Sequence, residues 1–375
     1  MWYARFYETD NTFPVKGKVN LLYGARRVGK TTLIKQILKK EGNNIFEGEG
    51  DDIRLRQILN SDDKALILNA FQDYDLVFID EAQRIDNIGW SLKILIDNLP
   101  NTTIIVSGSS SLKLSYKTGA PLTGRTFTRI LFPLSVLELK KQIGGMHIFQ
   151  NLENYLLYGM YPEVLTARNV KNKLTYLIEL LNSYLLKDIL ELENVRNSDK
   201  IYDLLRLIAY QIGDEVSLNE LANSLGLAKQ TVERYLNLLE KSFIIKKVSG
   251  FSKNLRKEVT KTKRYYFYDN GIRNAIINNF NLLRNRNDTG MLWENFMVSE
   301  RLKKQHYMQI LSNNYFWRTY DQKEVDLVEE REGRLYGYEF KWNPKKMKIQ
   351  KEWLETYSNA DFEIIHRENF LPFIS

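Results

Sequence analysis

VNLLYGARRVGKTT, residues 19–32, decides the fold expected for the first third of this chain. The apolar run predicts a buried strand, the glycine-containing segment a tight loop, and the residues that follow a helix. The pattern G-x-x-x-x-G-K-[ST] in this order is typical of a phosphate-binding loop, in which backbone N–H groups and the positive helix end converge on one place. We expect Lys30 to reach the β- and γ-phosphates of ATP as a catalytic residue, and Thr31 to hold Mg²⁺. The predicted nucleotide-binding residues are Gly24, Arg26, Arg27, Val28, Gly29, Lys30, Thr31 and Thr32.

Composition describes an ordinary globular protein with enough residues for two or three domains. The chain has 375 residues, of which 43% are hydrophobic and 27% charged, and it contains no cysteine. The absence of cysteine excludes disulfides, thiol catalysis and Cys-ligated zinc, and the three histidines lie too far apart in sequence for metal-ligand spacing. No apolar run approaches the roughly 18 residues of a membrane span, and the start lacks a signal-peptide pattern. We therefore expect a cytoplasmic protein without a membrane partner.

A second apolar run, in the sequence LVFIDEAQ, ends in an acidic pair. The run predicts a central strand whose end presents Asp80 and Glu81. Asp80 would orient the Mg²⁺ shell and Glu81 would position the attacking water, so both are predicted catalytic residues. Ser107 ends the next strand-like run and could sense the γ-phosphate. Ser109 and Ser110 could take that role instead, or all three serines could form a turn.

Short apolar runs alternate with helical patterns over the first 135 or so residues. This alternation predicts an α/β fold with a parallel sheet. Arg125 follows on a Gly/Pro-rich loop and is a candidate catalytic finger; the alternative is a solvated loop charge. A finger that acts in trans requires a homo-oligomer and one that acts in cis does not, so the sequence leaves the oligomeric state open.

The motifs GARRVGKTTL, VFIDEAQ, VSGSS, LTGR…FPLSVLE and YGMYPEV together resemble a family of prokaryotic AAA-type ATPases. Members of that family pair the ATPase with a carboxy-terminal domain of unknown function, and the resemblance covers nearly the whole chain. It implies an AAA-like core, a nucleotide held by the loop residues named above, and hydrolysis at Asp80 and Glu81. It also implies that Arg125 is the arginine of the family's Gly-Arg motif. The biological role is not implied.

A helix–turn–helix pattern occupies the middle of the chain, after a Leu- and Tyr-rich helical stretch. Ser217 and Glu220 form a capping-box sequence, and Gly226 provides a tight turn before a second helix. Two strand-like runs with basic residues between them follow, as in a winged helix. We expect the second helix to enter the major groove of double-stranded DNA and the wing to contact phosphates. The predicted DNA-binding residues are Gln230, Thr231, Arg234, Lys253, Arg256 and Lys257.

Positive charge is concentrated in this region, although the whole chain carries a net charge of only +8. Between Lys246 and Arg273 there are nine lysines and arginines against two acidic residues. Such a surface favours a polyanionic partner. Two alternatives stay open: winged helices also bind proteins, and a basic hairpin can be a solvated edge that discourages aggregation.

The last section places carboxylates and a lysine on neighbouring strands. In a strand, residues i and i+2 share a face, so Glu339 and Lys341 point together, and a hairpin can bring Asp326 beside them. Converging carboxylates repel each other and favour a divalent cation, to which Glu294 on the preceding helix could supply a third ligand. The lysine could then orient a metal-bound water. Alternating charge on an exposed strand would produce the same pattern without any site.

This arrangement is similar to the PD-(D/E)xK phosphodiesterase fold, matched by Asp326, Glu339 and Lys341 with Glu294 from the helix. It departs from that pattern at Val325, where the motif has proline. The resemblance implies metal-dependent DNA cleavage, although such domains also persist as inactive binding modules. The predicted domains are an AAA-like ATPase core (1–134), a helical lid (135–197), a winged helix (198–283) and an α/β nuclease-like domain (284–375).

The sequence thus favours a DNA-associated ATPase whose hydrolysis cycle moves a winged helix and a nuclease-like domain. The second hypothesis is a nucleotide-gated switch whose carboxy-terminal domain only holds DNA or a partner. A third is a regulator that binds protein instead of DNA.

Overall fold

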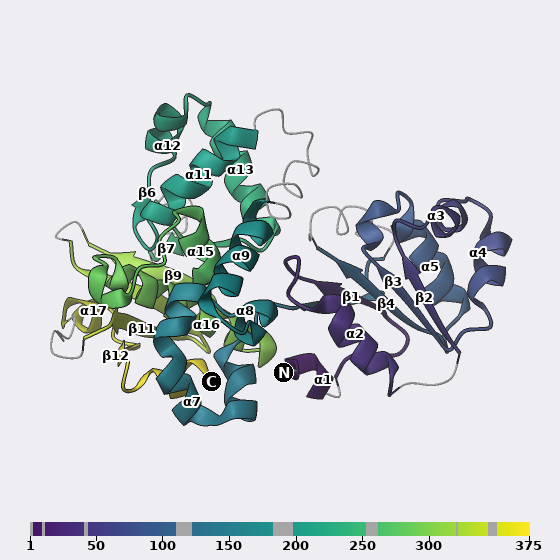
Figure 1. Ribbon diagram of the computed structural model, residues 1–375, viewed down its shortest axis with the longest axis horizontal. Helices are drawn as coiled ribbons and strands as arrows, with labels where there is room; N and C mark the ends of the chain where they lie inside the picture. Colours follow the sequence, from purple (N-terminus) through teal and green to yellow (C-terminus); the bar gives the residue numbers. More distant parts are fainter. Residues whose placement is uncertain are drawn as a thin grey trace. The chain divides into compact units, whose positions relative to one another are not determined.

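The chain folds into two units, each built on its own β-sheet (Figure 1). The first unit comprises Trp2–Phe132 with Lys241–Phe243, and the second comprises Pro133–Glu240 with Ile244–Ser375. The computed structural model describes residues 3–9, 12–40, 44–109, 122–182, 198–252, 262–319, 322–343 and 351–375.

The sheet of the first unit is parallel, with five strands in the order β2-β3-β4-β1-β5. Strands β1, β3 and β4 are almost fully buried, as expected for strands covered on both faces. The predicted mixed α/β fold with a parallel sheet is therefore confirmed for this part of the chain. The strands are β1 (Val19–Tyr23), β2 (Ile45–Glu49), β3 (Leu76–Asp80), β4 (Thr103–Gly108) and β5 (Thr126–Ile130).

Helices flank this sheet, and several begin at a side-chain cap (Figure 1). Asp52 and Asp63 accept hydrogen bonds from the first backbone N–H groups of two of these helices, as aspartate does at N-caps. The helices are α1 (Phe6–Thr9), α2 (Lys30–Leu38), α3 (Ile53–Leu59), α4 (Lys64–Phe71), the 3₁₀ turn η1 (Ala82–Arg84) and α5 (Ile88–Asn98).

The sheet of the second unit has seven strands in the order β12-β11-β10-β9-β7-β8-β6. Strand β7 pairs in parallel with β9 through Ser249 and Tyr315, so the hairpin at 245–267 and the carboxy-terminal strands form one sheet. An aromatic cluster around Trp317 and Trp353 packs against it. The strands are β6 (Glu215–Val216), β7 (Ile245–Gly250), β8 (Lys263–Phe267), β9 (Asn313–Arg318), β10 (Glu324–Arg331), β11 (Arg334–Lys341) and β12 (Ala360–His366).

The helices of this unit begin with α7, whose first turn carries a capping box between Ser135 and Glu138 and which kinks at Gly144. Helices α11, α12 and α13 lie together at one end of the unit (Figure 1). The helices are α7 (Val136–Tyr158), α8 (Pro162–Thr166), α9 (Val170–Leu180), α11 (Ser198–Tyr210), α12 (Leu218–Leu225), α13 (Lys229–Lys241), α15 (Asn270–Ile276), the 3₁₀ turn η3 (Leu283–Asn285), α16 (Thr289–Tyr307), α17 (Lys351–Thr356) and α18 (Phe370–Ile374).

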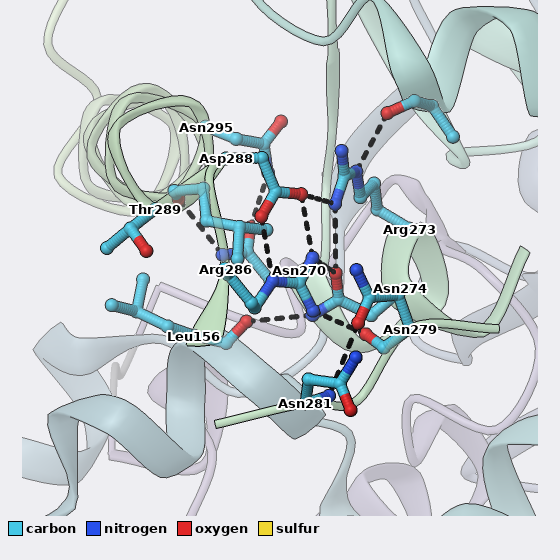
Figure 2. A network of polar contacts seen from close by, with 12 residues as sticks. Leu156, Asn270, Arg273, Asn274, Asn279, Asn281, Arg286, Asp288, Thr289 and Asn295 are labelled. Atoms are coloured by element: carbon cyan, nitrogen blue, oxygen red, sulfur yellow. Dashed lines mark hydrogen bonds and ion pairs between the residues drawn. The ribbon is translucent and has the colours of Figure 1, made fainter. Parts of the chain in front are cut away.

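A buried polar network joins α7, α11, α15 and the start of α16 (Figure 2). Arg273 donates from Nε to the carbonyl of Ala209 at 2.8 Å and from Nη1 to Asp288 Oδ2 at 2.6 Å. Asn274 donates to the carbonyl of Leu156 at 3.1 Å. Arg286 donates from Nε to Asp288 Oδ1 at 2.7 Å.

These contacts place the helices expected as a lid within the second unit. The same unit contains the helix–turn–helix region and the carboxy-terminal strands, and its sheet runs across the predicted boundary at residues 283 and 284. The finer division into a lid, a winged helix and a carboxy-terminal domain stays a prediction.

Candidate nucleotide site and carboxylate cluster

The predicted phosphate-binding loop lies between β1 and α2, at the carboxyl edge of the first sheet. Gly24 has φ +155°, and a Cβ atom there would lie 2.1 Å from the carbonyl oxygen of Leu131, so only glycine fits. The Lys30 side chain is buried, and its ammonium donates to the carbonyls of Gly24 at 2.9 Å and Ala25 at 3.0 Å. The lysine is thereby held inside the loop, where a phosphate would be bound.

A chain of hydrogen bonds links the start of α2 to the ends of β3 and β4. The Thr31 hydroxyl donates to Asp80 Oδ2 at 2.5 Å, and the Ser107 hydroxyl donates to Asp80 Oδ1. This is possible because β4 lies between β1 and β3, so that Ser107 is presented between the loop and the acidic pair. Thr31 and Asp80 together offer the hard oxygen atoms that Mg²⁺ prefers.

Glu81 follows the strand in a left-handed conformation, with φ +49°. Its carboxylate accepts a hydrogen bond from Gln83 Nε2, which also donates to Ser109 Oγ at 3.2 Å. Ser109 therefore supports the glutamate through Gln83, whereas Ser107 contacts Asp80 directly. Ser110 lies outside the described residues.

Arg5 is a residue of this site that sequence reasoning missed. Its side chain is buried, and Nη1 donates to the carbonyl of Val28 in the loop at 2.5 Å while Nη2 donates to the carbonyl of Phe132 at 2.7 Å. The guanidinium thus ties the amino-terminal segment to the back of the phosphate-binding loop. No motif marks this arginine, because its partners are backbone carbonyls distant in sequence.

Arg125 does not lie at the phosphate-binding loop of its own chain. It directly precedes β5, and the parallel register pairs Thr126 with Val19, so Arg125 is at the amino edge of the sheet. The five residues of β1 separate that edge from the loop, a distance of about 16 Å at roughly 3.3 Å per residue. Arg125 instead forms a bidentate ion pair with Asp97, at 2.6 and 3.1 Å. In this conformation Arg125 contacts Asp97 and not the loop, and its role as a finger, in cis or in trans, stays a prediction.

The helix predicted to contact DNA is α13, and its exposed and buried side chains lie on different faces. Gln230 and Arg234 are exposed, Thr231 is half-buried, and Val232 and Tyr235 face the core. Helix α12 ends at Gly226, which adopts a left-handed conformation and leads into the turn before α13; a DNA-binding role for this pair of helices stays a prediction. Lys253, Arg256 and Lys257 lie outside the described residues.

The predicted basic surface is largely neutralised where the structure describes it. Four of its nine cationic residues fall at 253–261, outside the described part. Each of the other five faces a carboxylate, and two of them, Arg264 and Arg273, are buried. The pairs are Lys246 and Lys247 with Glu240, Lys263 with Glu233, Arg264 with Glu324 and Arg273 with Asp288.

The second cluster of predicted site residues lies where β10 and β11 meet α16. Antiparallel pairing of the two strands brings Asp326 beside Glu339, and Asp326 Oδ2 accepts a hydrogen bond from the backbone N–H of Phe340 at 2.8 Å. Lys341 Nζ lies 2.5 Å from Glu339 Oε1. Glu294, from α16, accepts a hydrogen bond from the Tyr266 hydroxyl at 2.8 Å. The predicted residues are therefore brought together.

Burial dominates the protonation of these acids. It raises the pKa of Glu339 to about 7, and the neighbouring Asp326 carboxylate adds to that rise. Burial also raises the pKa of Asp326, against the opposing effect of Lys341. The pKa of Glu294 rises for the same reason, with Asp326 contributing. Carboxyls that resist ionisation are typical of sites where like charges share a low-dielectric space.

Arg264, from β8, enters the same cluster. Its Nη1 lies 3.6 Å from Glu294 Oε1 and 3.8 Å from Asp326 Oδ1, and its Nη2 lies 2.7 Å from Glu324 Oε2. In the described part of the chain, no three acidic or histidine side chains are arranged to hold a metal ion. The Arg264 guanidinium therefore faces two of the three predicted metal ligands, Glu294 and Asp326, and a metal-binding role for the set stays a prediction.

No helix within the described ranges is long and apolar enough to cross a membrane.

Comparison with family models agrees with the geometry of the first unit. Residues 16–140 match the model of an AAA domain. This segment is an AAA-type ATPase-like domain. Outside the AAA-like domain, residues 149–283 match a domain of unknown function (DUF8612), and residues 289–368 match another (DUF4143).

Relatives along most of the chain come from bacteria and archaea. An uncharacterized protein of Mycobacterium tuberculosis is 27% identical over 333 residues, which cover 87% of this chain and 70% of the relative. One of Methanocaldococcus jannaschii is 25% identical over 361 residues, 90% of this chain and 78% of the relative. Among solved structures, the Pif1 helicase from Bacteroides in complex with ADP-AlF3 and ssDNA is 16% identical, with a TM-score of 0.27 over 49% of this chain and 51% of that one. We draw no functional argument from a likeness of that size.

Proposed function

We propose that this protein binds and hydrolyses ATP with Mg²⁺ at the AAA-like domain and that the nucleotide state controls its binding to double-stranded DNA. The proposed ATPase activity rests on one observation. Hydrogen bonds join Thr31 and Ser107 to Asp80, and the Lys30 ammonium is buried in the neighbouring loop. These residues fit ATP with Mg²⁺, which the AAA-like fold implies. The loop N–H groups and Lys30 would hold the phosphates, and Thr31 and Asp80 would hold the Mg²⁺ ion and its shell. Bound Mg²⁺ would neutralise charge on the β- and γ-phosphates.

Within that site, Glu81 would orient the attacking water. Its hydrogen bond from Gln83 fixes the carboxylate direction, and the bond from Gln83 to Ser109 fixes the glutamine in turn. A carboxylate held in this way has little orientational freedom to lose as the reaction proceeds. The residues proposed to act on ATP are therefore Lys30, Thr31, Asp80 and Glu81.

For the DNA half of the proposal, α12 and α13 would act as a winged helix–turn–helix. The support is the short turn at Gly226 and the exposure of Gln230 and Arg234 near the start of α13. Side chains at that place on the second helix reach base edges and phosphates in this class of module. The wing that would carry Lys253, Arg256 and Lys257 is part of the same proposal.

DNA binding is tested with the full chain and a labelled duplex, with and without a non-hydrolysable ATP analogue. If about six phosphates are contacted, affinity should fall roughly 10³-fold between 50 and 200 mM salt. Arg234→Ala should weaken binding and lower the salt slope by about one, whereas the matched control Arg206→Ala, an exposed arginine of α11, should change neither. Equal affinity for the duplex at both salt concentrations would contradict DNA binding through phosphate contacts.

For the carboxy-terminal strands, we favour the hypothesis without catalysis: this region holds DNA or a partner and does not cut it. The support is the presence of Arg264 among the carboxylates that cleavage would need. Linear, circular and branched DNA incubated with Mg²⁺ or Mn²⁺ should remain intact with the wild-type protein. Cleavage by the wild type that Asp326→Ala abolishes would restore the nuclease hypothesis.

A further inference from the structure

Arg264 lies within 4 Å of three acidic residues of the cluster in the second unit, Glu294, Glu324 and Asp326. It reaches the cluster from β8 (Lys263–Phe267), and only 3% of its surface is exposed. Its guanidinium lies over the ring of Phe316, with Cζ 4.5 Å from the ring centre, a distance at which the ring attracts the cation. From this position it faces Glu294, Asp326 and Glu324, at the distances given above.

Each carboxylate of the candidate set already uses one oxygen in a contact with another group of the protein. Asp326 uses one oxygen for the N–H of Phe340, and Glu294 accepts from the Tyr266 hydroxyl. Glu339 pairs through Oε1 with Lys341, and its Oε2 is buried with no hydrogen-bond partner. A Mg²⁺ ion needs oxygen ligands at about 2.0–2.1 Å in octahedral array. A guanidinium nitrogen that lies 3.6 Å from Glu294 Oε1 and 3.8 Å from Asp326 Oδ1 competes with an ion for two of the three candidate ligands.

Electrostatics favours the arginine over an added ion. An arginine guanidinium does not lose its proton in proteins, and three carboxylates, those of Glu294, Asp326 and Glu324, lie within 4 Å of the Arg264 group, so its positive charge is permanent and compensated. A divalent ion placed among the same carboxylates would meet this fixed positive charge at short range in a poorly screened environment. The donor set therefore does not fit the metal that the PD-(D/E)xK resemblance implies.

We propose that Arg264 is the resident cation of this site, in the place that a divalent metal would take, and that the second unit binds no metal there. The arginine also joins β8 of the helix–turn–helix region to α16 and β10 of the carboxy-terminal part, so it couples two regions that the sequence treats as separate. This inference deepens the proposal of a non-cleaving carboxy-terminal region. Its test is a binding measurement, so that it can fail even if no DNA is cut, and survive even if DNA binding fails.

The test is titration of the nucleotide-free full chain with Mn²⁺, followed by electron paramagnetic resonance, on four proteins. Wild type and Asp326→Asn should bind the same number of Mn²⁺ ions. Arg264→Met should bind one Mn²⁺ ion per chain more than the wild type does. The added ion should disappear in the double variant Arg264→Met/Asp326→Asn.

Two results would overturn the inference. One is the loss of a Mn²⁺ ion from wild type on Asp326→Asn, which would show that a metal site already exists. The other is an Arg264→Met protein with a native circular dichroism spectrum that gains no ion. Should Arg264→Met not fold, the comparison of wild type with Asp326→Asn still decides: equal binding supports the inference, and loss of one ion overturns it.

Discussion

Replacement of Asp288 with alanine is the sharpest perturbation of the second unit, because this carboxylate serves two buried arginines at once (Figure 2). Its oxygens accept from Arg273 Nη1 at 2.6 Å and from Arg286 Nε and Nη2, both at 2.7 Å. The side chains of Arg273 and Arg286 are 1% and 0% exposed. Without the aspartate, both guanidiniums stay buried with no carboxylate facing them at this point of the network.

Removal of one partner from a buried ion pair costs about 3–5 kcal/mol, and we expect Asp288→Ala to fall in this range. Part of that energy depends on pH. Burial by itself raises the pKa of Asp288, but the hydrogen bonds from Arg286 and Arg273 outweigh it and lower the pKa to about 2. Because the pKa of Asp288 is lower in the folded than in the unfolded chain, the ionised carboxylate adds about 2 kcal/mol to the free energy of unfolding. This contribution is present above pH ~4 and is lost as the pH falls toward 2.

The assay is urea unfolding of the full chain, with hydrogen exchange of peptides from α15 and α16 to report on the second unit. The matched control is Asp361→Ala, since Asp361 also pairs with an arginine, Arg334 at 3.0 Å, but both side chains are more than half exposed. An exposed pair contributes about 0–1 kcal/mol. The reasoning would be refuted if Asp288→Ala cost no more than Asp361→Ala, or if Asp288→Asn kept the wild-type loss of stability between pH 4 and 2.

Two further predictions concern the AAA-like domain. Arg5→Ala should raise KM for ATP at least about tenfold and affect kcat less, because the loop loses a charge-assisted hydrogen bond at the Val28 carbonyl. Arg5→Lys should recover part of this loss. Steady-state kinetics of the three proteins test both expectations, and an unchanged KM in Arg5→Ala would show that the contact does not support ATP binding. Arg125→Ala should leave the ATPase rate of dilute protein within about twofold of the wild-type rate, because Arg125 pairs with Asp97 and not with the loop. A fall in rate on the order of 10³-fold that depends on protein concentration would instead show that Arg125 acts as a finger in trans.

The features of the nucleotide site that the sequence predicts are those encoded within a few residues. The loop from Gly24 to Thr31 and the pair Asp80–Glu81 are local motifs, and the strand endings that carry them meet at one edge of a parallel sheet. Arg5 and Gln83 escaped prediction because their roles depend on where a distant carbonyl or a neighbouring loop lies.

Charge counting along the sequence did not foresee the ion pairs of the second unit, for a physical reason. A tally of lysines and arginines along the chain takes no account of partners, and the partners are remote: Arg264 meets Glu324 across 60 residues of sequence. The parallel pairing of β7 with β9 was equally hidden, because no local pattern specifies which edge strand a hairpin will join. Asp326, Glu339 and Lys341 lie on two consecutive strands, so the sequence could predict that they would meet. It could not predict Arg264 beside them, because that arginine comes from a strand remote in sequence.

ATP hydrolysis and its link to DNA are tested most directly by the ATPase rate of the full chain in Mg²⁺. The rate is measured with and without double-stranded DNA, in the wild type and in Lys30→Ala. We expect hydrolysis by the wild type that changes when DNA is added, and a fall on the order of 10²-fold or more in Lys30→Ala, because the charge held in the loop by Gly24 and Ala25 is removed. No hydrolysis by the wild type under any condition, or an equal rate in both proteins, would contradict the proposal that this protein hydrolyses ATP at the Lys30 loop.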